Sequence, residues 1–491
     1  MADQVMTQQV TTYKNFIAGE WRDAHGRELF EVRSPANGEL LYRAQRSAVE
    51  DVHAAVAAAR EAFETTEWRD DPQVRTTALF KLSEAVRERH QDLAALLTRE
   101  SGKPLPISRG EALRLSETTS YYAGLVRWIF GRSQVPQPNS ISVILREPAG
   151  VVGIIVPWNA PLALLARALA PALAAGNAVV VKPASYTAGS TVELGRIIEN
   201  IPEFPKGIVN IVTGPGDPVG AELARHEDVD MIAFTGDTTT GREIMRLASG
   251  NLKKVSLELG GKSPTIVFAD ANFDRAIRGA INAASFYNAG QICIAGTRVL
   301  VESSVHDAFV ERVREIVPKM KIGPGWEKGV EVGPVISESQ MQKVLSYVEV
   351  GKREARLVVG GHRLTDGELA KGYFVAPTVF DEVPPDARIA QEEIFGPVMG
   401  IISFRDVDEA IRIANHTKYG LVAAVWTRDI NKAMKIATRV RAGSVWVNTF
   451  GKMYQSTEMG GFKQSGLGRQ YGLEGLFEYT ELKHVNIQIE K

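Results

Sequence analysis

The chain has 491 residues, 44% of them hydrophobic and 23% charged, a length at which a single core stops growing and chains divide into domains. The 57 basic and 58 acidic side chains nearly cancel, so the sequence lacks the basic excess that binds nucleic acid or an anionic membrane surface. We therefore expect a small-molecule partner, no nucleic acid and no membrane.

The sequence shows no targeting signal. The first residues carry no basic flank followed by an apolar core, so no secretion signal is expected. The most apolar stretches, 151–156 and 162–175, are interrupted by Pro157, Arg167 and Pro171 and fall short of the roughly 20 residues that span a bilayer. These features predict a cytoplasmic protein.

In chain order, a polar lead-in is followed by an amphipathic helix predicted over residues 48–63. From residue 151, short apolar runs alternate with helical segments, which indicates a buried parallel sheet of βαβ units. Ligands of such sheets bind beyond the carboxyl ends of the strands, so the segments PWNAP, KPAS, TGPG, TGDT and ELGG are expected at one functional edge. The runs are VVGIIV (151–156), AVVV (178–181), IVNIV (208–212), MIAF (231–234) and KVSLEL (254–259).

A second alternating series predicts a second α/β domain. It contains a helix over residues 273–289, and the loop with Cys293 follows that helix, near a domain boundary at about residue 259. The strands of the series are TIVF (265–268), RVLVE (298–302), GIISF (400–404), LVAAVW (421–426) and SVWVN (444–448).

Two further segments, ISVILR (141–146) and HVNIQIE (484–490), read as strands that fit neither domain. The second alternates apolar and polar residues, as an edge strand does, and an unprotected edge tends to pair with another chain. We therefore expect a homo-oligomer.

Cys293 is the only cysteine, which excludes internal disulfides, a CxxC redox pair and a multi-thiolate metal site. It is either a packed thiol or a nucleophile. In FYNAGQICIAGTR it lies between Gly290 and Gly296, and glycines allow a ligand to approach the backbone closely. A thiolate that attacks a carbonyl needs a backbone N–H beside it and a second donor for the oxyanion.

Asn159 and Glu258 are candidates for the remaining roles. Asn159, in PWNAP, offers an uncharged amide donor or caps a helix. Glu258 ends an apolar strand before two glycines. A partly dry carboxylate there has a raised pKa and acts as a general base, or else it forms a structural ion pair.

Asp237, in FTGDTTTG, stands at a helix N-terminus. That terminus suits an anion, or Asp237 is only its N-cap.

Taken together, these segments resemble the aldehyde dehydrogenase superfamily over nearly the whole chain. PWNAP is similar to the family's PWNxP, ELGGKSP to ELGGKxP, and GQIC to GQxC. EEIFGPV (392–398) and GFKQSGLGR (461–469) match two further family motifs in the same order.

The resemblance implies NAD(P)-dependent oxidation of an aldehyde to a carboxylate. Cys293 would attack the aldehyde, its own N–H and Asn159 would hold the oxyanion, and Glu258 would activate the water that hydrolyses the thioester. Relatives that pass the acyl group to coenzyme A generally lack this glutamate, so Glu258 favours hydrolysis. A non-catalytic protein of the same fold is the alternative from another class.

The resemblance also implies an α/β fold with a Rossmann-like cofactor-binding domain (1–125 and 149–258), an α/β catalytic domain (259–464) and a β-strand oligomerisation arm (126–148 and 465–491). Homodimers or homotetramers are the family habit. No metal is expected. The residues expected to bind NAD or NADP are Ile155, Pro157, Trp158, Lys182, Ser185, Gly236, Asp237, Gly241, Leu259, Glu393 and Phe395.

Two cofactor positions depart from the family pattern. Many NAD-preferring relatives have a glutamate where Ser185 stands; a carboxylate repels a 2′-phosphate, whereas a hydroxyl can donate to it, so NADP should be accepted. Asp237 replaces a common serine and adds negative charge near the pyrophosphate, unless its side chain turns away.

The residues expected at the substrate pocket also differ from the family pattern. Ala160 replaces a frequent aromatic residue and widens the pocket. Arg167 occupies the position of a carboxylate-binding arginine in enzymes similar to succinate-semialdehyde dehydrogenases, which suggests an anionic aldehyde; a structural ion pair is the other interpretation. Met453, Tyr454 and Met459 are expected as pocket walls.

Overall fold

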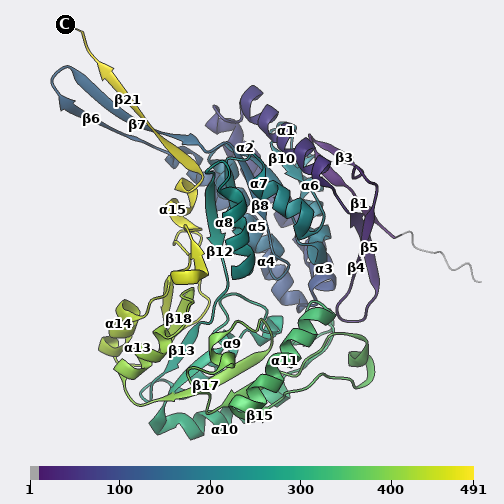
Figure 1. The fold of residues 1–491 in the computed structure, drawn as a ribbon, viewed down its shortest axis with the longest axis vertical. Helices are drawn as coiled ribbons and strands as arrows, with labels where there is room; N and C mark the ends of the chain where they lie inside the picture. Colours follow the sequence, from purple (N-terminus) through teal and green to yellow (C-terminus); the bar gives the residue numbers. More distant parts are fainter. Residues whose placement is uncertain (1–9, 491) are drawn as a thin grey trace, which may run out of the picture.

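The computed structural model describes residues 10–490 (Figure 1). They contain two large sheets, a smaller sheet and a projecting arm, with helices between the strands. The predicted α/β fold class is confirmed. The absence of a secretion signal concerns residues that lie largely outside the described range. Within residues 10–490, no helix is both long and apolar enough to cross a membrane.

The first sheet has eight strands around a parallel centre. The central five, β12, β11, β8, β9 and β10, are parallel as predicted, and every residue of β8, β9 and β11 is buried, as expected for a sheet covered on both faces. In spatial order the strands are β20 (Gly466–Leu467), β12 (Lys254–Glu258), β11 (Met231–Thr235), β8 (Val151–Ile155), β9 (Ala178–Lys182), β10 (Val209–Ile211), β2 (Asn15–Ile17) and β3 (Glu20–Arg22).

The helices of the first half of the chain pack around this sheet. Helices α1 and α5 both contact β8 and β9, and α8 contacts β11 and β12. Pro161 opens α5 at a position where no backbone donor is needed. The helices are α1 (Val49–Thr65), α2 (Pro72–Glu88), α3 (His90–Ser101), α4 (Leu105–Leu125), α5 (Pro161–Ala174), α6 (Ala188–Ile198), α7 (Ala221–Arg225) and α8 (Thr238–Ala248).

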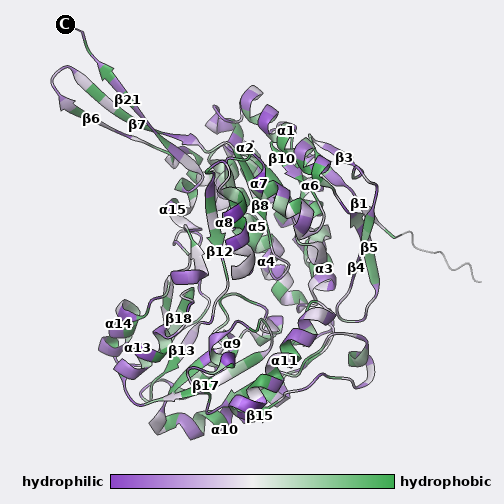
Figure 2. Cartoon of the chain, in the orientation of Figure 1, coloured by the Kyte–Doolittle hydropathy of each residue, from purple (hydrophilic) through white to green (hydrophobic). Residues whose placement is uncertain are grey.

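The second sheet has seven strands, all parallel to their neighbours except β15. In spatial order they are β15 (Arg356–Val359), β16 (Thr378–Asp381), β17 (Val398–Phe404), β14 (Arg298–Glu302), β13 (Pro264–Val267), β18 (Val422–Trp426) and β19 (Ser444–Val447). The helices of this half are α9 (Phe273–Ala283), α10 (His306–Ile316), α11 (Glu338–Glu354), α12 (Arg388–Gln391), α13 (Val407–Asn415), α14 (Ile430–Arg439) and α15 (Gly472–Phe477). Figure 2 shows hydrophobic residues concentrated in the strands of both sheets.

The local structure differs from the sequence analysis in two places. The polar lead-in before residue 48, for which no element was predicted, forms β2 and β3 and a small sheet of β1 (Thr12–Tyr13), β5 (Leu40–Gln45) and β4 (Leu29–Arg33). The helix predicted over 273–289 ends at Ala283. Ser285 and Ala289 have φ angles of 58° and 50°, a left-handed conformation that no α-helix continues through.

The arm is a three-stranded antiparallel sheet that projects from the body (Figure 1). Its strands are β21 (Thr480–Gln488), β7 (Ser140–Pro148) and β6 (Arg132–Gln137). The two segments predicted as strands outside both domains therefore pair with each other, with the predicted edge strand β21 at one side of the sheet. The predicted domain division groups 465–491 with this arm, yet Gly466–Leu467 pairs with β12 of the first sheet and the arm strand begins at Thr480.

Candidate active site

The carboxyl ends of four neighbouring strands meet at one edge of the first sheet. Ile155 at the end of β8 lies opposite Lys182 of β9, and Thr235 of β11 lies opposite Glu258 of β12. The loops that follow these strands carry most of the predicted site residues, so the edge predicted from the sequence is the edge where they gather.

The loop that carries Cys293 is fitted closely to two other loops. A Cβ atom on Gly290 would lie 1.9 Å from the Gly396 carbonyl oxygen, and one on Gly261 would lie 2.4 Å from the Cys293 carbonyl oxygen. Gly290 also has a φ of 70°, which favours glycine. The glycines therefore bring the ELGG and FGP segments against the backbone of the cysteine loop.

Cys293 lies where two cavities meet. One cavity, of about 220 Å³, is lined by Glu258, Asn159 and many of the residues predicted to bind the cofactor. The other, of about 260 Å³, is lined by Ala160, Arg167 and Met453, the residues predicted to face the substrate. We call them the cofactor-side cavity and the aldehyde-side cavity. The sulfur is thus accessible from both.

Asn159 is buried and its amide is oriented by the cysteine loop. Its Nδ2 donates to the Gln291 carbonyl at 3.0 Å, which leaves a second N–H on the same nitrogen. It does not cap α5, because the N-cap residue is Ala160 and no side chain of that residue accepts a hydrogen bond. The interpretation of Asn159 as a helix cap is therefore wrong.

Glu258 is buried, and its Oε1 has no hydrogen-bond partner within residues 10–490. Burial raises the pKa of this carboxyl to about 8, although Arg167 and Arg469 act in the opposite direction. No ion pair involving Glu258 exists among the described residues, so the structural ion pair considered for it is wrong. A carboxyl with a raised pKa and a free oxygen beside a cavity is a general-base candidate.

The thiol of Cys293 is held in its neutral form at ordinary pH. Burial raises its pKa well above the usual range, the charge of Arg167 lowers it, and the carboxylates of Glu393 and Glu258 raise it further. The nucleophilic species is the thiolate, so a proton must pass from the sulfur to solvent before attack.

Trp158, Glu393 and Phe395 form one wall of the cofactor-side cavity. The Trp158 and Phe395 rings pack edge to face with centroids 5.4 Å apart. Glu393 accepts a hydrogen bond from the Gly261 N–H at 3.0 Å, and a Cβ on Gly260 would lie 2.2 Å from its carboxylate. Burial raises the pKa of Glu393 to about 7.

Asp237 serves as the N-cap of α8. Its Oδ1 accepts from the Thr239 and Thr240 N–H groups at 2.7 and 3.3 Å, so the capping interpretation holds, although the residue still lines the cofactor-side cavity together with Pro157 and Gly236. Gly241 lies behind this wall, where an added Cβ would meet Leu259 at 2.5 Å. These two residues pack α8 against the site rather than line it.

Ile155, Lys182 and Ser185 lie outside that cavity, at the start of the neighbouring loops. Lys182 Nζ donates to the Pro183 carbonyl at 3.0 Å, and burial lowers its pKa to about 8. Ser185 Oγ donates to the Gly214 carbonyl at 3.1 Å. The hydroxyl proton expected for a 2′-phosphate is therefore already engaged.

Arg167 is buried in the wall of the aldehyde-side cavity. Its guanidinium lies over the Tyr471 ring, 5.0 Å from the centroid, and donates to Met453 Sδ at 3.4 Å. It forms no ion pair within residues 10–490, and its Nε has no partner there. The structural ion pair considered for Arg167 is therefore wrong.

Two of the predicted pocket walls do not line either cavity. Met459 is buried in an apolar cluster with Ile294 and Leu421 behind the cysteine loop, because its backbone pairs with that of Gln470. Tyr454 is 59% exposed. These predictions are wrong because the sequence locates the variable loop without showing which of its side chains turn inward.

The structure adds site residues that the sequence did not single out. Gln340 and Lys343, on α11, line the cofactor-side cavity, and Lys103, Glu111 and Arg114 line the aldehyde-side cavity. Ser337 is an N-cap residue followed by apolar residues at helical spacing, and this pattern predicts helix α11. The sequence around the helix does not indicate which sheet edge the helix faces.

Comparison with known proteins agrees with the site. The model of the aldehyde dehydrogenase family matches residues 21–485. Betaine aldehyde dehydrogenase of Bacillus subtilis is 44% identical over 473 residues, 96% of each chain. Aldehyde dehydrogenase 1A1 of Gallus gallus is 44% identical over 484 residues, 97% of this chain and 93% of the relative. A crystal structure of betaine aldehyde dehydrogenase from Staphylococcus aureus in complex with NAD+ superposes with a TM-score of 0.96 at 38% identity, covering 97% of this chain and 95% of that one.

The chain belongs to the aldehyde dehydrogenase family. It is an oxidoreductase of the nicotinamide-dependent class that acts on aldehydes, as the sequence predicted.

Proposed function

We propose that this enzyme oxidises an anionic aldehyde to the carboxylate through a thioester on Cys293. The observation that carries the proposal is the position of Cys293 between a cavity lined by Glu258 and a cavity lined by Arg167, whose guanidinium forms no ion pair among the described residues and whose Nε has no hydrogen-bond partner there. The roles proposed for Asn159, Glu258 and the residues of the two cavities follow from this position of Cys293.

The first step is attack by the Cys293 sulfur on the aldehyde carbon. The thiol first loses its proton to solvent water, which leaves the thiolate. The S–C bond then forms as the carbonyl π electrons move onto oxygen, and the free N–H of Asn159 with the Cys293 N–H stabilises the resulting oxyanion. Asn159 is suited to this because the Gln291 carbonyl occupies its other N–H and fixes the amide plane.

Glu258 then serves hydrolysis. When the oxyanion collapses, hydride leaves and a thioester remains, and the Glu258 carboxylate takes a proton from water as the water oxygen attacks the thioester carbon. The thiolate leaves and the product is a carboxylate. The free Oε1 of Glu258 has the capacity to accept that proton.

The residues of the cofactor-side cavity fit a nicotinamide cofactor. The buried Glu393 carboxylate can accept from ribose hydroxyls, Lys343 offers a cation, and Trp158 and Phe395 offer an apolar wall; Lys182 and Ser185 lie at the neighbouring strand ends for the adenosine portion. When bound there, NAD(P) supplies the hydride acceptor. Ser185 has no carboxylate to repel a 2′-phosphate, so NADP should be accepted. Its hydroxyl already donates to Gly214, so it gives NADP no added hydrogen bond, and we expect both NAD and NADP to be used.

The aldehyde-side cavity favours a negatively charged substrate. Arg114 and Arg167 form no ion pair among the described residues, while the cationic Lys103 and anionic Glu111 neutralise each other at 2.6 Å. The cavity therefore carries excess positive charge, which attracts a carboxylate-bearing aldehyde. Several relatives are named for betaine aldehyde, whose quaternary ammonium this charge would repel.

The test is a set of initial rates of NADH and NADPH formation with succinic semialdehyde, propionaldehyde, benzaldehyde and betaine aldehyde. We expect the highest kcat/KM with the semialdehyde. A preference for betaine aldehyde would overturn the substrate class while leaving the reaction in place. If no aldehyde reduces either cofactor and neither nucleotide binds, a non-catalytic protein of the same fold replaces the proposal.

Arg167→Met is expected to lower kcat/KM for the semialdehyde by roughly 10–100-fold, the worth of a charge-assisted hydrogen bond. Removing this charge also raises the pKa of Cys293 and Glu258, so the ratio of kcat/KM for semialdehyde to that for propionaldehyde is the decisive measurement. Arg167→Lys, which keeps the charge, is the control. An unchanged ratio in Arg167→Met would contradict the assignment.

We also propose that the arm joins copies of the chain into a homodimer or homotetramer, in the cytoplasm. Leu482 and Ile487 of β21 are 58% and 47% exposed. Among residues 10–490, no strand pairs with the outer edge of β21, and such an edge tends to pair. Leu482→Glu combined with Ile487→Glu should shift sedimentation velocity toward monomer. Ile430→Glu with Met434→Glu, an equally exposed apolar pair on α14, should leave the assembly intact. A wild type that sediments as a monomer would refute the role of the arm.

A further inference from the structure

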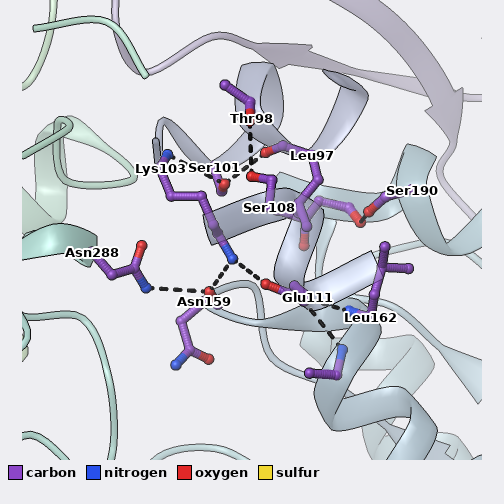
Figure 3. Close-up of polar contacts among 12 residues, drawn as sticks. Leu97, Thr98, Ser101, Lys103, Ser108, Glu111, Asn159, Leu162, Ser190 and Asn288 are labelled. Carbon is purple, nitrogen blue, oxygen red and sulfur yellow. Dashed lines mark hydrogen bonds and ion pairs between the residues drawn. The ribbon is translucent and has the colours of Figure 1, made fainter. Parts of the chain in front are cut away.

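A buried ion pair lies directly behind the proposed oxyanion donor (Figure 3). Lys103, just after α3, and Glu111, on α4, are 1% and 6% exposed and approach within 2.6 Å. Neither residue belongs to a motif that the sequence singled out, and neither takes part in the steps above. Their remaining side-chain hydrogen bonds go to the Asn159 carbonyl and to the start of helix α5.

The lysine holds the backbone of that turn. Lys103 Nζ donates to the Asn159 carbonyl oxygen at 2.7 Å, and Asn288 Nδ2 donates to the same oxygen at 3.3 Å. Asn288 also donates to the Gln291 carbonyl, which accepts from the Asn159 amide. The main chain and side chain of Asn159 are therefore fixed by separate contacts. Figure 3 shows the two contacts on its main-chain carbonyl.

The glutamate holds the helix that follows. The N-cap of α5, Ala160, has no side-chain acceptor, and the N–H groups of Leu162 and Ala163 would be unsatisfied at the helix start. Glu111 Oε1 accepts from both, at 2.9 and 3.4 Å. A carboxylate from another helix thus supplies the missing cap and complements the helix dipole.

We propose that Lys103 and Glu111 form a positioning pair, which aims the Asn159 amide at the aldehyde oxygen by fixing the Asn159 carbonyl and the first turn of α5 that follows it. Net stability does not explain such a pair, because desolvation offsets most of the attraction between buried charges. The geometry of the pair gives the explanation. A displacement of about 1 Å in a reacting group lowers the rate of catalysis on the order of 100-fold, so a pair that holds the turn in place has a large effect. The inference rests on the proposed function, in which Asn159 is the oxyanion donor.

The kinetic test uses Lys103→Met and neutral propionaldehyde. We expect kcat for the first turnover to fall on the order of 100-fold with KM little changed, since the loss of an oxyanion donor costs roughly that much. If Lys103 instead bound substrate directly, KM would rise and only for anionic aldehydes, and the proposal would be overturned.

A double-mutant comparison separates positioning from general weakening. If Lys103 acts through Asn159, Lys103→Met should cause little further loss in an Asn159→Ala background. Effects that multiply would overturn the proposal. The control is Lys253→Met, since Lys253 is also buried and donates to two carbonyls, of Ala224 and His226, away from the site. It should lower thermal stability without changing kcat.

Amide hydrogen exchange tests the proposal without any turnover. In Lys103→Met the N–H groups of residues 158–160, 162 and 163 should lose protection, whereas in Lys253→Met they should not. Unchanged protection in Lys103→Met would overturn the proposal even if no aldehyde were oxidised. Should Lys103→Met fail to fold, Glu111→Gln is used instead. It keeps a carbonyl for the α5 cap, and we expect about a 10-fold loss in kcat.

Discussion

Cys293→Ser should abolish aldehyde oxidation, lowering kcat on the order of 10⁴-fold or more, because the hydroxyl is a far weaker nucleophile than the thiolate and no residue is placed to activate it. Reduced cofactor formed per enzyme, followed by absorbance, gives the measurement. The substitution is nearly isosteric and Cys293 is one of many lining residues, so nucleotide binding should survive as the control.

A second measurement uses the fact that this is the only cysteine of the chain. A thiol-alkylating reagent should add one label by intact mass and inactivate in proportion to labelling. Because burial raises the pKa of Cys293, labelling should be slow at pH 7 and accelerate with rising pH. Full activity in a completely labelled enzyme would exclude Cys293 as the nucleophile.

Glu258→Gln should stall after one turnover. The thioester still forms, so a burst of reduced cofactor equal to the active-site concentration is expected, followed by a steady rate lower by about 10²–10⁴-fold, the usual contribution of a general base. Rapid-mixing absorbance resolves the two phases. Equal losses in burst and steady phases would place Glu258 in the first step instead.

The pH dependence of hydrolysis follows from the same group. The base acts only when ionised, and burial raises the pKa of Glu258 to about 8. Below that pH the hydrolysis rate should rise about tenfold per pH unit, and above it the rate should level off. Glu258→Gln should lack this inflection, and a wild-type rate that is flat from pH 6 to 9 would contradict the assignment.

The sequence predicted the functional edge of the first sheet and the residues Asn159, Glu258 and Cys293. Strands β8, β9 and β11 are apolar on both faces along nearly their whole length, and they are fully buried in the structure because the sheet is covered on both sides. Motifs that follow such strands must meet at one edge, so Asn159 and Glu258 could be placed from the chain alone. Cys293 was linked to them only by family resemblance.

The rest depended on packing between distant segments. The period of a helix shows that α11 exists but not that Gln340 and Lys343 face a cavity, and the lead-in strands are too short and polar to signal pairing with the first sheet. The helix predicted to reach 289 ended early because Ser285 and Ala289 adopt left-handed backbone angles, a cost that residue propensities do not reveal. Lys103 became visible as a site residue only through its contact with Asn159.

Among the residues of the described chain, Asn159, Leu164 and Cys293 are the three that line both cavities. The other lining residues of the two cavities are separate sets. With the roles proposed above, we expect mutations of Ala160, Arg167 or Met453 to change the aldehyde that is accepted without disturbing the nucleotide, and changes around Ser185 or Lys343 to do the reverse. An enzyme built this way can acquire new specificities one ligand at a time, in evolution or in the laboratory.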